Sequence, residues 1–350
     1  MKKYLTMSVM ALQLVTILSL LYSKLLYASV PEFPEKTGPY QLQTIEFRNL
    51  HDTNRDNRQV PIKIHLPIKA EKWPVVIFSH GAGGHWDANI GQAKHLASYG
   101  YAVLCVEHIG SNTEVMKRSI RWLNNVKAMT RDANEVLNRP KDISFAIDRA
   151  IEWNKNNNKL KGRLDTDHIG VIGHSFGSYT TLAILGARPA LNWLTPRVGE
   201  GKGLGPDLSD QRVKAGIALS PQGPGEPFFL IPSYSGLRKP VLGITGSKDK
   251  SQSGDPESRR QFFKVIPPGN KMFIWLNNAD HTAFSDSSEA GRYGLPSRSR
   301  EEVQPIARAT TLLFFEGHLR GDAKALESIS EKNFKRLLGK VVDGIEIMRK

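Results

Sequence analysis

Six short runs of apolar residues recur between positions 74 and 276. Each is five to seven residues long, and they occupy positions 74–78, 101–106, 168–172, 213–219, 240–245 and 272–276. Strands with apolar side chains on both sides are typical of a parallel sheet that helices cover on both faces. The runs therefore predict six central strands of such a sheet.

Helical patterns separate these runs, most clearly over positions 140–153. One face of this segment is aliphatic and is formed by Ile143, Ile147, Ala150 and Ile151. Pro140 suits the first turn of the expected helix, where a missing backbone N–H does no harm. Alternating strands and helices predict an α/β three-layer sandwich with a mostly parallel central sheet.

A different pattern precedes these runs, in which apolar and polar residues alternate. Val60, Ile62, Ile64 and Leu66 are spaced in this way. Strict alternation indicates a half-buried edge strand. Positions 44–50 are expected to pair with it, which gives an antiparallel N-terminal ribbon.

Three segments fit the alternation of strands and helices poorly. Segments 109–139 and 188–212 follow elements that end at the carboxyl edge of the sheet, where α/β proteins bind ligands, so we interpret them as lid-like insertions. The third insertion, 221–238, is rich in proline and carries an apolar group at Phe228–Ile231. This group forms either the wall of an acyl pocket or the ordinary packing of a long loop.

Residues 1–28 have the layout of a secretory signal peptide. Lys2 and Lys3 precede an apolar stretch at about 5–21, and small residues follow at Ala28. An uncleaved membrane anchor is the alternative, because the apolar stretch is long for a signal peptide and Lys24 follows it. In both cases we expect residues 29–350 to form a single exported domain.

Composition narrows the classes of function. Lys and Arg number 48 against 34 Asp and Glu, which gives a formal net charge of +14. A basic surface suits nucleic acid, anionic lipid or simply solubility. No zinc-finger spacing, RNP-like motif or basic stripe with interleaved aromatics supports a nucleic-acid partner. Cys105 is the single cysteine and is expected to be a buried thiol. His85, His95 and His108 lack a metal-binding spacing, so we expect no metal and no other cofactor.

Candidate chemistry gathers at Gly173-His-Ser-Phe-Gly177, between a predicted strand and a helix of small residues. A serine at such a turn adopts a strained conformation that exposes its hydroxyl, and the flanking glycines avoid collisions with neighbouring elements. Ser175 is therefore the candidate nucleophile. His174 is a candidate supporting residue.

A nucleophilic serine needs a base and a carboxylate that orients the base. Asp249 follows the strand at 240–245, and His281 follows the strand at 272–276, so the chain order is Ser, Asp, His. Asp255, in a polar loop, is the alternative acid. Asp280 is adjacent to the histidine in sequence and is expected to brace its own loop.

A glycine-rich turn, Ser79-His-Gly-Ala-Gly-Gly84, follows the strand at 74–78. Such a turn lets backbone amides approach a substrate oxygen, so the N–H groups of Ala82 and Phe176 are the candidate oxyanion-hole donors. His80 is expected to orient this turn without transferring protons.

The segments 79–84, 173–177, 245–249 and 279–281 together resemble exported serine α/β-hydrolases of the predicted dienelactone hydrolase and platelet-activating-factor acetylhydrolase-like group. The likeness covers roughly positions 40 to 320. It implies an α/β-hydrolase fold and hydrolysis of carboxylic esters through an acyl-serine intermediate. True dienelactone hydrolases carry cysteine where this chain has Ser175, so their lactone substrate is not carried over.

The sequence thus predicts a serine esterase, lipase-like in type, with a small-molecule or lipid-like ester as substrate. A phospholipase or acetylhydrolase-like enzyme and a polyester-degrading hydrolase are alternatives, and a catalytically silent binding module is the non-enzymatic alternative.

Basic residues are interleaved with apolar residues between Lys117 and Arg131, and the apolar residues recur at helical spacing. This segment is either an ordinary surface helix or a lid that contacts an anionic membrane surface.

Overall fold

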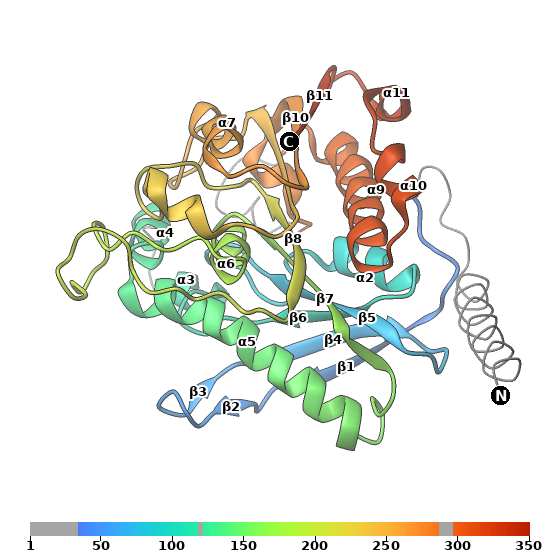
Figure 1. Ribbon diagram of the computed structural model, residues 1–350, viewed down its shortest axis with the longest axis horizontal. Coiled ribbons are helices and arrows are strands. Elements are labelled where there is room, and N and C mark those ends of the chain that lie inside the picture. The colour runs from blue at the N-terminus through green and yellow to red at the C-terminus, as the bar shows by residue number, and fades with distance from the viewer. Residues whose placement is uncertain (1–33, 118–121, 287–296) are drawn as a thin grey trace, which may run out of the picture. The chain divides into compact units, whose positions relative to one another are not determined.

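A nine-stranded mixed sheet organises the chain (Figure 1). The computed structural model describes residues 34–117, 122–286 and 297–350. The strands run across the sheet in the order β1 (Leu42–Phe47), β4 (Ile62–Pro67), β6 (Ala102–Val106), β5 (Trp73–Ser79), β7 (Leu164–His174), β8 (Val213–Leu219), β9 (Val241–Lys248), β10 (Lys271–Asp280) and β11 (Ile345–Arg349). Two further short strands, β2 (His51–Asp52) and β3 (Arg58–Gln59), form a separate hairpin.

The six expected central strands are confirmed as the parallel part of the sheet. Every neighbouring pair from β6 to β10 is parallel, and the antiparallel strands lie at the two sides. Their side chains are buried almost throughout, as expected for strands that are covered on both faces.

Helices cover the sheet on both faces (Figure 1). One layer contains α5 (Ala133–Asn156), α6 (Phe176–Ile184) and α7 (Pro256–Val265), and the other contains α2 (Ile90–Ser98) and α9 (Arg300–Leu319). Two glycines in adjacent strands show which helices lie on which face of the sheet. A Cβ added to Gly216 would meet Leu185, which follows α6, whereas one added to Gly170 would meet Phe315 of α9. The three-layer α/β-hydrolase architecture is confirmed.

Within the described residues, the remaining helical elements are short and lie in the connections and near the C-terminus. They are α3 (Thr113–Lys117), α4 (Trp122–Met129), α10 (Ala323–Ser328), α11 (Glu331–Phe334), and the 3-10 turns η1 (Ile231–Gly236), η2 (His281–Phe284) and η3 (Lys335–Leu337). In the part of the chain that the structure covers, none of the helices is long and apolar enough to cross a membrane. The expected signal peptide lies outside the described residues. The described residues all fall within one compact unit, Glu32–Lys350.

The expectation of a half-buried edge strand at 60–66 is wrong. β4 pairs on one side with β1 and on the other with β6, and all six of its residues are buried. The polar positions mislead because partners distant in sequence cover them. Lys63 forms ion pairs with Asp87 at 2.6 Å and Glu46 at 3.1 Å, and His65 shares a hydrogen bond with the Thr44 hydroxyl. The edge strand is β1.

Helix α5 begins at Ala133 and not at Pro140, so Pro140 lies inside the helix and not in its first turn. Asp132 caps the N-terminus by accepting hydrogen bonds from the amides of Asn134 and Glu135 at 2.8 and 3.1 Å. The end of the expected insertion 109–139 therefore belongs to the helical layer. This extension carries Arg139, whose side chain donates to the hydroxyl of Ser79 at the end of β5.

The three expected insertions are joined to one another by backbone hydrogen bonds. The Thr195 amide donates to the Arg131 carbonyl at 2.7 Å, which connects the first insertion to the second. The Ala190 amide donates to the Phe228 carbonyl at 2.7 Å, which connects the second to the third. These segments thus form one continuous layer of loops. Their action as lids stays a prediction.

The apolar group of the third insertion divides into two parts. Phe228 is buried and stacks on Phe176 and Tyr179, with ring centres 5.2 and 4.5 Å apart. Ile231, in contrast, is exposed. The contacts of Phe228 favour ordinary packing of the loop against α6 over an acyl-pocket wall.

Candidate active site

Ser175 lies at the sharp turn between β7 and α6. Its backbone has φ +56° and ψ −114°, which is strained for a residue with a side chain. The turn is held by two hydrogen bonds of 3.0 Å, one from the Ser175 amide to the Leu219 carbonyl and one from the Gln222 side chain to the Ser175 carbonyl. A Cβ on Gly173 would collide with the Gly177 carbonyl, so the tight turn requires glycine there.

The structure brings Ser175, His281 and Asp249 into one hydrogen-bonded series. Ser175 Oγ lies 2.9 Å from His281 Nε2, and His281 Nδ1 lies 2.7 Å from Asp249 Oδ1. Asp249 follows β9 directly and is fully buried, whereas 17% of the His281 side chain is exposed. When Nδ1–H donates to the carboxylate, Nε2 is left to accept the serine proton, which is the arrangement that general-base catalysis needs.

The other two acidic candidates lie in structural positions. Asp255 caps the N-terminus of α7, where its carboxylate accepts from the Ser258 amide at 2.8 Å. Asp280 caps η2 and accepts from the amides of Thr282 and Ala283 at 3.0 and 3.1 Å. Asp280 therefore braces its own loop, as expected. Of the three acids, Asp249 is the one against the His281 ring.

Arg259 is a member of this site that the sequence analysis missed. It is wholly buried on α7, and its Nε lies 2.9 Å from the same Asp249 oxygen that faces His281. Its other N–H groups donate to the Ser220 and Pro221 carbonyls and to a serine hydroxyl. Burial alone would raise the pKa of Asp249, but the Arg259 guanidinium and then His281 hold that pKa well below its usual range. The carboxylate is therefore ionised.

The glycine-rich turn after β5 lies beside the candidate nucleophile. A Cβ on Gly81 would be 3.5 Å from the Ser175 Cβ. The turn is closed by a hydrogen bond from the Gly84 amide to the Gly81 carbonyl at 3.1 Å. Over the described ranges, the amides of Ala82 and Phe176 donate to no other group, so both are available to a substrate oxygen.

The two supporting histidines hold backbone groups. His80 donates from Nδ1 to the Gly81 carbonyl at 2.7 Å and accepts the His108 amide at Nε2. His174 donates from Nε2 to the His281 carbonyl at 3.0 Å. Burial lowers the pKa of His80 well below its ordinary value and that of His174 to about 3. Both rings are neutral at pH 7, and both orient the loops that carry the site.

Two expectations concern residues away from this site. Cys105 is buried, and burial raises the pKa of its thiol to about 12. Within residues 34–117, 122–286 and 297–350, no group of three or more His, Cys, Asp or Glu side chains has the arrangement of a metal site.

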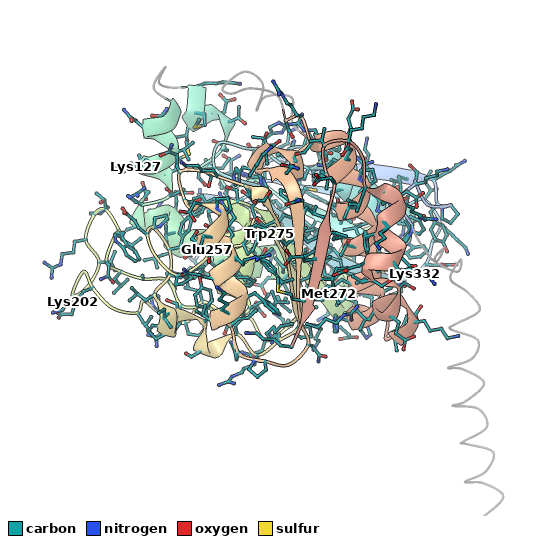
Figure 2. The ribbon with its side chains drawn as sticks, turned by 90° about the horizontal axis from the view of Figure 1, so that it is seen from above. Lys127, Lys202, Glu257, Met272, Trp275 and Lys332 are labelled. Atoms are coloured by element: carbon teal, nitrogen blue, oxygen red, sulfur yellow. The ribbon has the colours of Figure 1, made fainter. Side chains whose placement is uncertain are left out.

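The basic segment Lys117–Arg131 is described only in part, because Arg118 and Arg121 lie outside the described residues. Lys117 pairs with Glu114 at 2.8 Å, and Arg131 pairs with Glu226 at 2.7 Å. Lys127 is exposed and points away from the fold (Figure 2). Met129 is buried, as in an ordinary amphipathic helix. Contact of this segment with anionic membranes stays a prediction.

Comparison with known proteins adds an independent observation. The model of the family described as "Platelet-activating factor acetylhydrolase, isoform II" matches residues 41–119. The platelet-activating factor acetylhydrolase of Cavia porcellus is 28% identical over 273 residues, which cover 65% of this chain and 52% of that protein. The protein of the same name from Canis lupus familiaris is 24% identical over 260 residues, or 65% and 51% of the two chains.

Cutinase 2 of Thermobifida cellulosilytica is a relative of another kind, with 24% identity over 212 residues that cover 58% of this chain and 68% of the cutinase. The chain spans about half the length of the acetylhydrolases that it matches. The expected resemblance to platelet-activating-factor acetylhydrolase-like serine hydrolases is confirmed by these matches.

Several buried histidines predict that the fold is sensitive to acid. Burial lowers the pKa of His65 and His95 to about 4 and that of His108 and His174 to about 3. In the unfolded chain each histidine titrates near pH 6.5, so between about pH 6.5 and 4 the unfolded chain binds protons that the folded chain does not. The free energy of unfolding is therefore greatest above about pH 6.5. It should decrease below that pH by up to about 1.4 kcal/mol per pH unit for each histidine.

Denaturant unfolding at pH 7.5, 6 and 5 measures this slope. His95→Gln is a suitable comparison, because a glutamine amide can replace the Nε2 donor to the Pro34 carbonyl. In this variant the unfolding free energy should depend less steeply on pH, by the contribution of one histidine. An unfolding free energy that does not change between pH 7.5 and 5 would contradict the prediction.

Proposed function

We propose that this chain is a serine hydrolase that cleaves carboxylic esters through an acyl-serine intermediate. The observation that carries the proposal is the hydrogen-bonded series from Ser175 through His281 to Asp249. The amides of Ala82 and Phe176, which donate to no other group over the described residues, support it. The relatives are acetylhydrolases and cutinases, which are carboxylic ester hydrolases, and this similarity supports the same class of reaction.

The proposed reaction uses side chains and backbone amides of this chain, together with water. His281 Nε2 takes the proton of Ser175 Oγ as that oxygen attacks the ester carbonyl carbon, and ionised Asp249 stabilises the imidazolium. The carbonyl oxygen becomes negative and accepts hydrogen bonds from the Ala82 and Phe176 amides. His281 then protonates the leaving alkoxide. Water, deprotonated by His281, then attacks the acyl carbon. The bond from that carbon to Ser175 Oγ breaks as His281 returns the proton to Oγ, which releases the carboxylic acid.

The proposed substrate is a small-molecule or lipid-like ester. The acetylhydrolase relatives favour a short acyl group on a phospholipid, whereas the cutinase relatives favour a polyester. Nitrophenyl esters of increasing acyl length, assayed beside a short-acyl phospholipid and a polyester film, distinguish these substrates. A catalytically silent binding module would hydrolyse none of them and would not react with a fluorophosphonate.

We also propose that the enzyme acts after export from the cytoplasm, because residues 1–28 carry the pattern of a signal peptide. N-terminal sequencing of the exported protein tests this. An N-terminus at Met1 would support the uncleaved anchor instead.

Ser175→Ala should abolish labelling by a fluorophosphonate and lower ester turnover by about 10⁴-fold or more, because the variant lacks the attacking oxygen. Ser178→Ala is the matched control. This neighbouring serine of α6 is buried, and its hydroxyl has no hydrogen-bond partner in the part of the chain that the structure describes. Circular dichroism checks that both variants fold. Normal turnover by folded Ser175→Ala would refute the serine mechanism.

Asp249→Asn should lower kcat by about 10³- to 10⁴-fold, because an amide at this position favours the wrong His281 tautomer. Asp255→Asn should retain nearly full activity, since asparagine also caps helices well. Steady-state kinetics on one soluble nitrophenyl ester compares the two variants. The opposite ranking would assign the acid role to Asp255.

A further inference from the structure

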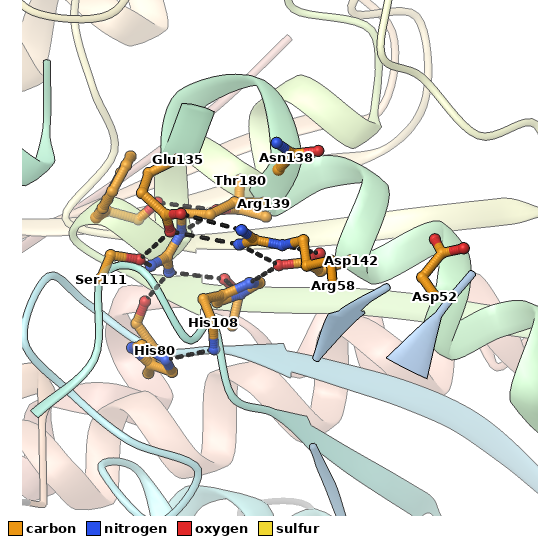
Figure 3. Close-up of polar contacts among 12 residues, drawn as sticks. Asp52, Arg58, His80, His108, Ser111, Glu135, Asn138, Arg139, Asp142 and Thr180 are labelled. Carbon is orange, nitrogen blue, oxygen red and sulfur yellow. Dashed lines mark hydrogen bonds and ion pairs between the residues drawn. The ribbon is translucent and has the colours of Figure 1, made fainter. Parts of the chain in front are cut away.

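A buried polar cluster lies beside His80, where the glycine-rich turn begins, and contains Arg139 of α5 (Figure 3). The Arg139 side chain has no solvent exposure. Its Nη1 donates to the Ser111 hydroxyl at 2.7 Å, and its Nη2 donates to the Ser79 hydroxyl at 3.2 Å and to the His80 carbonyl. The contacts with Ser79 and His80 hold the chain that enters the glycine-rich turn from β5.

The same guanidinium also contacts the segment that follows Ser175. Its central carbon lies 4.2 Å from the centre of the Phe176 ring. Its Nε donates to the Thr180 hydroxyl at 3.1 Å, and that hydroxyl donates to the Phe176 carbonyl at 3.1 Å. Arg139 therefore connects the two segments whose amides are the proposed oxyanion donors.

A second Ser-His-Asp series lies in this cluster. Ser79 Oγ is 2.9 Å from His108 Nε2, and His108 Nδ1 is 2.9 Å from Asp142 Oδ2. All three side chains are fully buried, and the Ser79 hydroxyl already accepts a hydrogen bond from Arg139. The series is therefore closed to a substrate. It holds His108, whose backbone amide donates to the His80 ring at 3.0 Å.

Carboxylates and a second arginine complete the cluster. Glu135 accepts from the Ser111 hydroxyl at 2.9 Å and pairs with Arg58 at 3.1 Å, and Arg58 also pairs with Asp142 at 2.9 Å. Burial lowers the pKa of Arg139 to about 9, while Glu135 and Asp142 oppose this effect, so Arg139 is a cation at neutral pH. Arg58, which pairs with both carboxylates, reaches the cluster from the β2–β3 hairpin.

We propose that Arg139 is a positioning residue that fixes the Ala82 and Phe176 amides relative to each other. The inference rests on the proposed function. The two amides belong to different elements, the turn after β5 and the start of α6, so a rigid oxyanion hole needs a group that holds both. A planar guanidinium can donate hydrogen bonds from its edge to the turn while its face stacks on Phe176. A lysine ammonium cannot do both.

This role predicts a defect in transition-state binding. Oxyanion donors act mainly on the charge that develops on the carbonyl oxygen, so their misplacement lowers kcat more than it raises KM. In Arg139→Lys we expect kcat on a soluble nitrophenyl ester to fall about 10²-fold, with KM within about twofold. The inhibition constant of a trifluoromethyl ketone should rise by a similar factor, because the adduct of the ketone with Ser175 carries the oxyanion.

Arg58→Lys is the matched control, because it alters the same buried cluster without touching the His80 carbonyl or the Phe176 ring. It should lower the unfolding free energy but leave kcat and trifluoromethyl ketone inhibition within about twofold of the wild type. Thr180→Val is a second test that does not depend on the folding of Arg139→Lys. It removes the hydroxyl between Arg139 and the Phe176 carbonyl, and it should lower kcat and ketone affinity together by about tenfold.

The inference is overturned if Arg139→Lys folds and keeps the kcat and the ketone affinity of the wild type. If Arg139→Lys does not fold, the same result for Thr180→Val overturns the inference. It is also overturned if Arg58→Lys shows the same loss of ketone affinity, because the effect would then belong to the stability of the cluster. A wild-type protein without ester turnover or labelling of Ser175 would refute the proposed function itself.

Discussion

The close approach of the α6 backbone to the end of β5 is the constraint on which the candidate site depends. A Cβ on Gly177 would collide with the Ser79 carbonyl, so α6 can reach its position only with glycine there. This approach brings the Ser175 turn against the glycine-rich turn. His281 and Asp249 reach the same place because β9 and β10 end at the same edge of the parallel sheet.

The helical layer of α5, α6 and α7 supplies this site with more than the candidate nucleophile. Arg259 of α7 holds the Asp249 carboxylate, and Arg139 of α5 holds the entry to the glycine-rich turn. Each guanidinium is wholly buried and donates to several oxygens. Removing one partner of such a buried contact leaves a polar group without its hydrogen bond, so these arginines restrict the geometry of the groups around them.

The central strands could be predicted because their side chains are apolar on both faces, as in strands that are covered on both sides. The N-terminal ribbon could not be predicted fully, because the partners that bury Lys63 and His65 come from other parts of the chain. Ser175, Asp249 and His281 could be selected because each follows a predicted strand. Arg139 and Arg259 carried no signal, since a charged side chain normally faces solvent. Their burial depends on oxygen atoms from distant strands, loops and helices.

The backbone hydrogen bonds among the three insertions restrict how these loops can vary. Each insertion uses its main chain to satisfy the main chain of another, as in the pairs Thr195 with Arg131 and Ala190 with Phe228. Shortening one of them would leave an amide or a carbonyl of its neighbour without a partner. Although the insertions are far apart in sequence, their lengths are therefore coupled, and a change in one requires a compensating change in another.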